Sequence, residues 1–430
     1  MLFPTFIFGQ SLFENSVNEN DTTQKKAGLI FNGYGRASAY GASKLYDYSN
    51  VFGEFSLQAK TTKGKAFLFT DLRFRSGLEF NEYNTTFELK EAYAAYKSDK
   101  IDISLGQKII SWGKADIFNP TNNITPNNYF FLSAKPDDQK IPNFLLETKF
   151  YFGNGINLEL IGIPFYKPSV YRYDLFDLEE YTQFTEAVLP EKTFENGSLA
   201  AKLNFEFPKI DCSLSWFQGY SPFYGFNLNS INYNPQGMPQ IELNTQTYLK
   251  QTFGMDFSLP IKSWIVKAEI AYKHTTDYET NMYIPNPELY YIVGMEHNFW
   301  GFHLIGQYIG RYIFDFSQLM LPNPPEMQDI IYQNLQLFNR KIFYQQEKQN
   351  HAFSLSINKS FIYETLKTEL AAYYNIGTEE WFIRPSVSYS LSDALLFTIG
   401  GFYSTGPENS IFEYSSDIFN GAFMELKMNF

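Results

Sequence analysis

The chain has 430 residues, among them 44 Phe and 32 Tyr but only 5 Trp and a single Cys. Its formal net charge of −12 is dispersed, without a basic tract, which argues against nucleic acid as a partner. Cys212 has no second cysteine with which to form an intramolecular disulfide or a metal cluster, and no run of 18 apolar residues offers a transmembrane helix.

The N-terminal 26 residues differ in character from the rest of the chain. Residues 2–8 are apolar and lead to Gly9 and Gln10, so we interpret 1–10 as the remnant of a signal peptide without its basic leading region. The alternative is a disordered tail with some apolar residues. We expect 11–26 to form a periplasmic leader and 27–430 to form a single domain.

Alternation of apolar and polar residues, typical of half-buried β-strands, begins at residue 27 and recurs to the end of the chain. Hairpin signals such as Gly153-Asn154-Gly155 separate several segments. The pattern predicts an all-β fold with about 18 strands, or 16 as the fallback, an even number as bacterial outer-membrane barrels require. The predicted strands are 27–40, 51–60, 65–75, 85–97, 101–108, 143–152, 156–163, 197–207, 210–219, 248–259, 263–273, 289–297, 301–311, 351–359, 365–375, 381–390, 394–402 and 421–430.

The connections between these strands alternate long and short along nearly the whole chain, the long ones including 76–84, 164–196, 220–247 and 312–350. Tight periplasmic turns, longer extracellular loops and an aromatic-rich outer band are typical of outer-membrane barrels. Because hydrocarbon leaves no backbone polar group unsatisfied, half-apolar strands favour a closed transmembrane antiparallel β-barrel. A soluble sandwich or propeller, the alternative, gives no reason for the alternating loop lengths.

Strand parity also predicts which charges face the lumen. In 65–75 the apolar residues point outward and the charged ones inward. Either Arg73, Arg75 and Lys108 form one basic wall opposite an acidic one, or ion pairs hold a wet lumen together, since strong selectivity would need a ring of one sign. The predicted lumen charges are Arg36, Asp71, Arg73, Arg75, Lys108, Glu147 and Lys149, and the same parity turns Glu269 and Lys273 inward.

The last predicted strand, 421–430, is amphipathic and ends in Phe430. A final amphipathic strand with a terminal aromatic residue resembles the assembly signal that the bacterial barrel-assembly machinery reads. We therefore expect that machinery, together with outer-membrane lipid, among the partners of the chain.

One segment, 109–142, does not alternate and carries four prolines, a Trp and two adjacent Phe. Proline cannot donate to a β-ladder, and a long loop with its own apolar content is usually functional. By parity it is the third extracellular loop, and we predict that it folds into the lumen as a plug or constriction. A specific ligand site is the second possibility, and the two are compatible. The predicted constriction residues are Trp112, Lys114, Asp116, Asn119, Thr121, Tyr129 and Phe130.

This region also resembles a family. The motifs are Glu91-Ala92-Tyr93, Leu105-Gly106-Gln107, Trp112-Gly113-Lys114-Ala115-Asp116, Asn119-Pro120-Thr121-Asn122 and Thr125-Pro126. They are similar to the signature of the porin-like DUF1302-type family of Gram-negative outer-membrane barrels. The chain departs from that pattern in lacking an Arg before Gln107, in Lys for Arg at 114 and in Asn for Asp at 122, and a Lys offers no planar fork for a carboxylate. The resemblance implies a channel associated with lipid or hydrophobic-compound transport.

Two further segments bear on function. Residues 326–346 have roughly helical apolar spacing, which predicts a short extracellular helix that covers the pore, meets a partner or packs on the barrel rim. His351 and Ser354 lie three apart, on opposite faces of a strand, so they do not form a Ser–His pair. Without metal-ligand spacing or a nucleotide fingerprint, we expect no enzyme, cofactor or metal.

We therefore predict a porin-like channel of the bacterial outer membrane for small or amphipathic solutes, narrowed or gated by 109–142. One alternative is an outer-membrane component of a lipid or hydrophobic-compound transport or export system, with a periplasmic or inner-membrane partner. The other is a structural or adhesive surface barrel with a sealed lumen.

Overall fold

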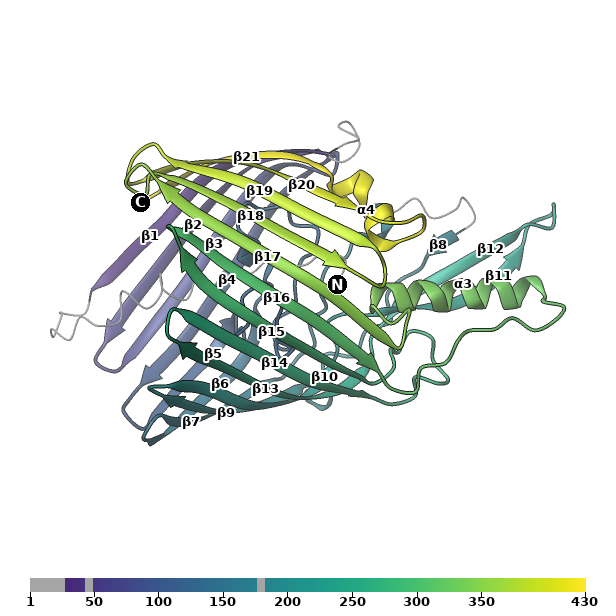
Figure 1. Cartoon of the computed structure of the whole chain (residues 1–430), viewed down its shortest axis with the longest axis horizontal. Helices are drawn as coiled ribbons and strands as arrows, with labels where there is room; N and C mark the ends of the chain where they lie inside the picture. Colours follow the sequence, from purple (N-terminus) through teal and green to yellow (C-terminus); the bar gives the residue numbers. More distant parts are fainter. Residues whose placement is uncertain (1–27, 43–48, 176–181) are drawn as a thin grey trace.

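The alternating segments form a closed antiparallel sheet of 18 strands (Figure 1). The computed structural model describes residues 28–42, 49–175 and 182–430, so the predicted signal-peptide remnant 1–10 and leader 11–26 lie outside the described residues. The barrel strands are β1 (Leu29–Ala42), β2 (Asn50–Lys63), β3 (Ala66–Glu79), β4 (Glu82–Lys97), β5 (Ile101–Lys108), β6 (Asn143–Gly153), β7 (Ile156–Ile163), β9 (Ser198–Phe207), β10 (Ile210–Tyr220), β13 (Leu249–Ile261), β14 (Trp264–Thr275), β15 (Glu288–Phe299), β16 (Phe302–Ile313), β17 (Gln349–Phe361), β18 (Leu366–Asn375), β19 (Glu380–Ser390), β20 (Leu395–Thr405) and β21 (Gly421–Asn429).

The predicted 18-stranded barrel is confirmed, and every predicted strand overlaps one of these. The predicted long loop 76–84 is wrong, because β3 and β4 continue to a tight turn at Phe80-Asn81. Both turn residues have positive φ, 50° and 62°, as the turns of two-residue hairpins require. The hydroxyls of Ser76, Tyr83 and Thr85 bond across this hairpin, which keeps its strands paired.

The two faces of the barrel wall differ as strand periodicity requires. On β2, Val51 and Phe55 are about half exposed on the outside, whereas Glu54 and Ser56 are buried on the lumen side. Apolar side chains therefore face outward, as a transmembrane barrel needs. No helix among the described residues is long and apolar enough to cross a bilayer.

The barrel closes between the first and last strands. β1 pairs with β2 and with β21, and the backbone of Phe430 exchanges two hydrogen bonds of 3.0 Å with that of Gly33. The Phe430 ring stacks on Phe55 at 5.6 Å between ring centroids and lies against Gly33, where a side chain would collide with it. Phe430 thus completes the seam of the closed sheet, while its role as an assembly signal stays a prediction.

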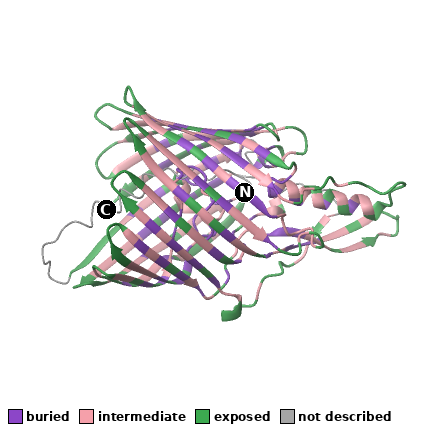
Figure 2. Ribbon diagram, turned by 60° about the horizontal axis from the view of Figure 1, so that its bottom comes forward, coloured by how far each residue is buried: buried purple, intermediate pink, exposed green. Residues whose placement is uncertain are grey.

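The two ends of the barrel differ. The C-terminus and eight short connections lie at one end, here called the turn end, and the long connections lie at the other, the loop end, together with the short β3–β4 and β18–β19 connections (Figure 1). The loop end carries a three-stranded sheet, ordered β11-β12-β8, and two helices; the sheet and the longer helix beside it project beyond the barrel wall (Figure 1 and Figure 2), while the shorter helix packs against β20. These elements are β8 (Thr182–Phe184), β11 (Gly225–Tyr233), β12 (Pro239–Gln246), α3 (Met327–Ile342) and α4 (Ile411–Phe419), with the 3-10 turns η1 (Pro136–Gln139), η2 (Tyr173–Leu175) and η3 (Phe194–Asn196).

The predicted helix in 326–346 is confirmed as α3, which begins with a capping box between Glu326 and Asp329. It packs beside β11. Asn339, which is buried, accepts a hydrogen bond from Phe226 N at 2.8 Å and donates one to Phe226 O at 2.7 Å, so its amide pairs with β11 as a neighbouring strand would. The helix therefore covers the projecting sheet.

Candidate functional site

The segment 109–142 connects β5 to β6 and folds into the lumen, where only η1 is regular. Trp112, Ile117, Thr121 and Phe130 are each at most 3% exposed. We divide the segment into a proximal lobe, residues 110–125, and a distal lobe, residues 127–140. The two lobes bind opposite arcs of the barrel wall.

The proximal lobe binds the arc from β7 to β14. Trp112 Nε1 donates a hydrogen bond to Glu159 Oε1 on β7 at 2.9 Å, and Lys114 Nζ donates to Asp211 on β10 at 2.6 Å. Asp116 accepts from Lys267 Nζ on β14 at 2.6 Å. Three predicted constriction residues therefore each hold a different strand of the wall.

Glu269 on β14 is the main anchor of the proximal lobe. Its carboxyl group accepts hydrogen bonds from Ala115 N at 2.5 Å and Thr121 Oγ1 at 3.1 Å, and also from the Asn119 amide at 2.9 Å when the nitrogen of that amide faces it. The chain comes this close because residue 113 is a glycine with φ of +113°, where a Cβ would lie 2.5 Å from Glu269 Oε1. Strand parity turned Glu269 inward, but no local pattern indicated its partners.

The distal lobe binds the opposite arc through Asp138. Its carboxylate accepts from Arg36 on β1 at 2.7 Å, from Arg73 on β3 at 3.1 Å and from Ser133 at 2.6 Å. Burial alone would raise the pKa of Asp138, but Arg36 and Arg73 outweigh it and hold this pKa below its usual range. Lys90 on β4 donates to the Asp138 carbonyl at 2.9 Å and so binds the backbone of the same turn.

The predicted lumen charges lie in ion pairs. Arg36 contacts Glu54 at 2.7 Å, and Arg73 contacts Asp71 at 3.1 Å. The other contacts are Arg75 with Glu54 at 3.4 Å and Glu79 at 2.6 Å, Lys149 with Glu147 at 3.6 Å and Glu159 at 3.3 Å, and Lys108 with Glu147. Arg73, Arg75 and Lys108 each have a carboxylate partner, so they form no bare basic wall.

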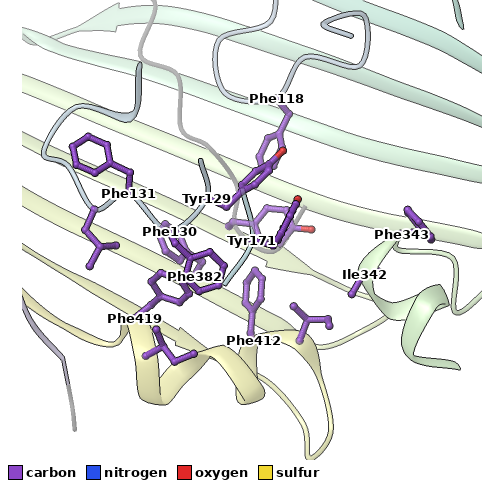
Figure 3. Packing of buried hydrophobic residues seen from close by; sticks show 14 of the residues in the cluster. Phe118, Tyr129, Phe130, Phe131, Tyr171, Ile342, Phe343, Phe382, Phe412 and Phe419 are labelled. Carbon is purple, nitrogen blue, oxygen red and sulfur yellow. The ribbon is translucent and has the colours of Figure 1, made fainter. Parts of the chain in front are cut away.

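Tyr129 and Phe130 join a buried aromatic cluster at the loop end (Figure 3). Tyr129 stacks on Tyr171 of the β7–β9 connection at 4.8 Å between centroids, and Phe130 lies 5.1 Å from Phe419 of α4. Sequence reasoning did not single out Tyr171 or Phe419. The cluster ties the distal lobe to the loop end.

A cavity of about 150 Å³ lies between the inward loop and the wall, lined by Lys250, Lys273, Glu288, Arg311 and other residues. Lys273 and Arg311 share Glu288, at 2.7 and 3.0 Å. Lys250 Nζ donates to Asn123 of the proximal lobe at 2.9 Å. Three basic side chains therefore surround one carboxylate on the consecutive strands β13 to β16, and sequence reasoning had assigned only Lys273 among them to the lumen. No group of three or more potential His, Cys, Asp or Glu metal ligands occurs among the described residues.

A closed 18-stranded barrel with an apolar outer face and a loop in its lumen defines a porin-like transmembrane β-barrel. No family model and no curated protein matches the sequence, so membership of the DUF1302-type family stays a prediction.

Solved structures share this fold across nearly their whole length. Pseudomonas aeruginosa OpdK with vanillate is 8% identical with a TM-score of 0.57, over 94% of this chain and 98% of that one. OccK5 (OpdH) of the same organism is 9% identical with a TM-score of 0.53, over 94% and 97%. Acinetobacter baumannii OccAB2 is 8% identical with a TM-score of 0.52, also over 94% and 97%. At such identities the likeness concerns the fold.

Proposed function

We propose that this chain is a bacterial outer-membrane channel for small solutes, narrowed by the segment 109–142. The observation that carries the proposal is the attachment of that one loop to both sides of the lumen, through Glu269 and through Asp138. An 18-stranded barrel is wide enough for an aqueous lumen unless something folds into it. The turn end then faces the periplasm and the loop end the cell exterior.

The cavity beside the loop supports a preference for small anionic solutes. Lys250, Lys273 and Arg311 outnumber the single carboxylate of Glu288 there. Aromatic side chains, including Tyr129, line the same space and suit a flat apolar body. OpdK, which shares the fold, was solved with vanillate, an aromatic carboxylate.

We propose transport without catalysis. His351 bonds through Nδ1 to the Tyr308 hydroxyl at 2.6 Å, whereas Ser354 Oγ donates to Gln307 at 3.2 Å. The two residues therefore have separate partners, and this arrangement does not activate a serine nucleophile.

Single-channel conductance in a planar bilayer tests the proposal. We would compare the intact protein with a variant in which residues 113–140 are replaced by a short Gly-Ser linker. Removing both anchored lobes should raise the conductance several-fold. As the matched control, replacing the hairpin tip 234–237, outside the lumen, should leave the conductance unchanged.

If the intact protein and the loop variant both stay closed, the channel proposal fails. Two alternatives then remain. One is a sealed component of a lipid or hydrophobic-compound transport system that works with a periplasmic or inner-membrane partner, and the other is a structural surface barrel. Potassium benzoate on one side of the bilayer and potassium chloride on the other would test the anion preference by the reversal potential.

A further inference from the structure

The short connections at the turn end fall into two groups around the barrel rim. Five consecutive ones, from β2–β3 to β13–β14, have polar or charged residues at their tips, such as Lys65, Asp99 and Lys209. The next three, β15–β16, β17–β18 and β19–β20, carry large apolar side chains, in the last two beside a single acidic residue, Glu364 or Asp393. The apolar side chains are Trp300, Ile362, Tyr363 and Leu391, which are 82%, 62%, 101% and 55% exposed.

The backbone conformation of the apolar turns does not explain their side chains. Trp300, Ile362 and Tyr363 have φ of 50°, 51° and 52°, as tight hairpin turns require, and Lys262 in a polar turn has φ of 57°. Turns of this kind ordinarily hold Gly, Asn or Asp. Because Tyr363 is fully exposed, packing within the folded chain does not account for its large side chain either. The exposed apolar surface of these turns therefore points to a contact outside the chain.

The apolar turns continue the lipid-facing surface of the barrel. Phe299 and Phe361, which end the strands before two of these turns, are exposed by 48% and 39%. The Phe299 ring stacks on Trp300 at 4.6 Å between centroids. Lys359 Nζ lies 3.9 Å from the centroid of the Phe302 ring and donates to the Trp300 carbonyl at 3.2 Å. Trp and Tyr are enriched where a membrane meets water, and lysine reaches from apolar surface to the polar layer there.

We propose that the turns bearing Trp300, Ile362, Tyr363 and Leu391 are embedded in the headgroup layer of the surrounding membrane. The partner is the phospholipid surface of the leaflet at the turn end. Interfacial anchors of this kind set the tilt of a membrane protein. The arc from β15 to β20 therefore sits deeper than the arc from β2 to β14, whose polar and charged turns stay in water. The proposal holds whatever solute the barrel carries.

Site-specific fluorescence tests the depth of the two arcs. In a Cys212→Ser background, we would place a single cysteine by Tyr363→Cys or, as the matched control on the polar arc, by Asp99→Cys. Both sites are exposed turn positions. Each variant is labelled with a nitrobenzoxadiazole probe and reconstituted in phosphatidylcholine vesicles that contain no other protein. Circular dichroism verifies the barrel, and Leu391→Cys replaces Tyr363→Cys if the latter fails to fold.

We expect the probe at 363 to emit at shorter wavelength and to be quenched by headgroup-labelled lipid at least threefold more than the probe at 99. Equal quenching at the two sites would overturn the proposal. A probe at 363 that stays in water in pure lipid, and is covered only after periplasmic proteins are added, would also overturn it, because the patch would then serve a protein.

Discussion

At the scale of single residues, Glu269 determines where the inward loop lies. One buried carboxyl group receives donors from Ala115, Thr121 and Asn119, which follow one another within the proximal lobe. Leaving any of these buried donors without its acceptor would cost free energy. This one side chain, together with the space left by Gly113, fixes the backbone path of the loop against β14.

Glu269→Gln should loosen the proximal lobe. The amide nitrogen of glutamine is itself a donor, and it would face loop groups that now donate hydrogen bonds to the carboxyl oxygens. Leaving one of these buried donors without its acceptor costs about 1–3 kcal/mol. That change raises the ratio of loosened to docked loop roughly ten- to hundredfold, since each 1.4 kcal/mol is about a factor of ten. Single-channel recording should show more frequent high-conductance events.

Glu369→Gln is the matched control, since that carboxylate pairs with Lys367 on the same strand, β18, at 2.6 Å. It should leave the channel record unchanged. An equal effect of the two substitutions would mean that lumen charge, rather than the docking of the loop, determines the conductance.

Asp138 makes the attachment of the distal lobe dependent on pH. The pKa of Asp138 is held below its usual range although burial raises it, because Arg36 and Arg73 favour the ionised form more strongly. The ion pairs thus stabilise the folded chain fully above the unfolded pKa of about 3.9, and their contribution falls as the pH drops toward the lowered value.

Asp138→Asn removes the charged partner of Arg36 and Arg73 and should therefore lower the free energy of unfolding at pH 7. The loss should be limited to about 2 kcal/mol, because both arginines keep other carboxylate partners. The difference from the wild type should stay constant down to about pH 5 and shrink below about pH 4. Urea unfolding in detergent micelles at several pH values measures it. Asp137→Asn, beside it in the same turn, is the control, and a difference that persists unchanged into strong acid would contradict the assignment.

At the scale of elements, amide side chains hold the loop end together by hydrogen-bonding to backbone N–H and C=O groups, as a neighbouring strand would. Asn339 of α3 pairs with both polar groups of Phe226, and Gln345 does the same with Asn286 at 2.9 and 3.0 Å. Asn420 pairs in this way with Ser404 at 2.6 and 2.8 Å. An amide side chain offers one donor and one acceptor like a peptide unit. Irregular connections thereby satisfy backbone groups that a sheet would otherwise pair.

Asn339→Ala should detach α3 from β11, because it leaves the buried amide and carbonyl of Phe226 without these partners at a cost of about 1–3 kcal/mol. Hydrogen exchange of the α3 amides should accelerate roughly tenfold or more. Asn334→Ala, on an exposed face of the same helix, should not change the exchange. Unchanged exchange in the Asn339 variant would show that apolar packing alone holds the helix.

At the scale of the whole molecule, strand periodicity predicts the barrel because each strand has one face in lipid and one in the lumen. It fails in the loop end. β11 has an irregular register between Leu228 and Ser230, which breaks the period of two. α4 has only nine residues, too few for a helical repeat to stand out. The Phe80-Asn81 turn carries no glycine to signal it.

The sequence predicts the position of the inward loop and some of the wall charges that face it, but not which of these groups bind each other. Proline content and position place 109–142 in the lumen, and strand parity turns Arg36, Arg73 and Glu269 toward it. Closure of the barrel places strands that are far apart in the sequence, such as β1 and β14, around one lumen. The pairing between a wall charge and a loop atom depends on that closure. Pairings of that kind, such as Asp138 with Arg36 and Arg73, have no local signal.

The two-sided attachment of the inward loop has a mechanical consequence. A closed cylindrical sheet can deform toward an elliptical cross-section. The inward loop spans the lumen from Glu269 on one side to Arg36 and Arg73 on the other, so it resists that deformation. The segment that narrows the passage is thus also the brace that keeps the cross-section of the barrel in shape.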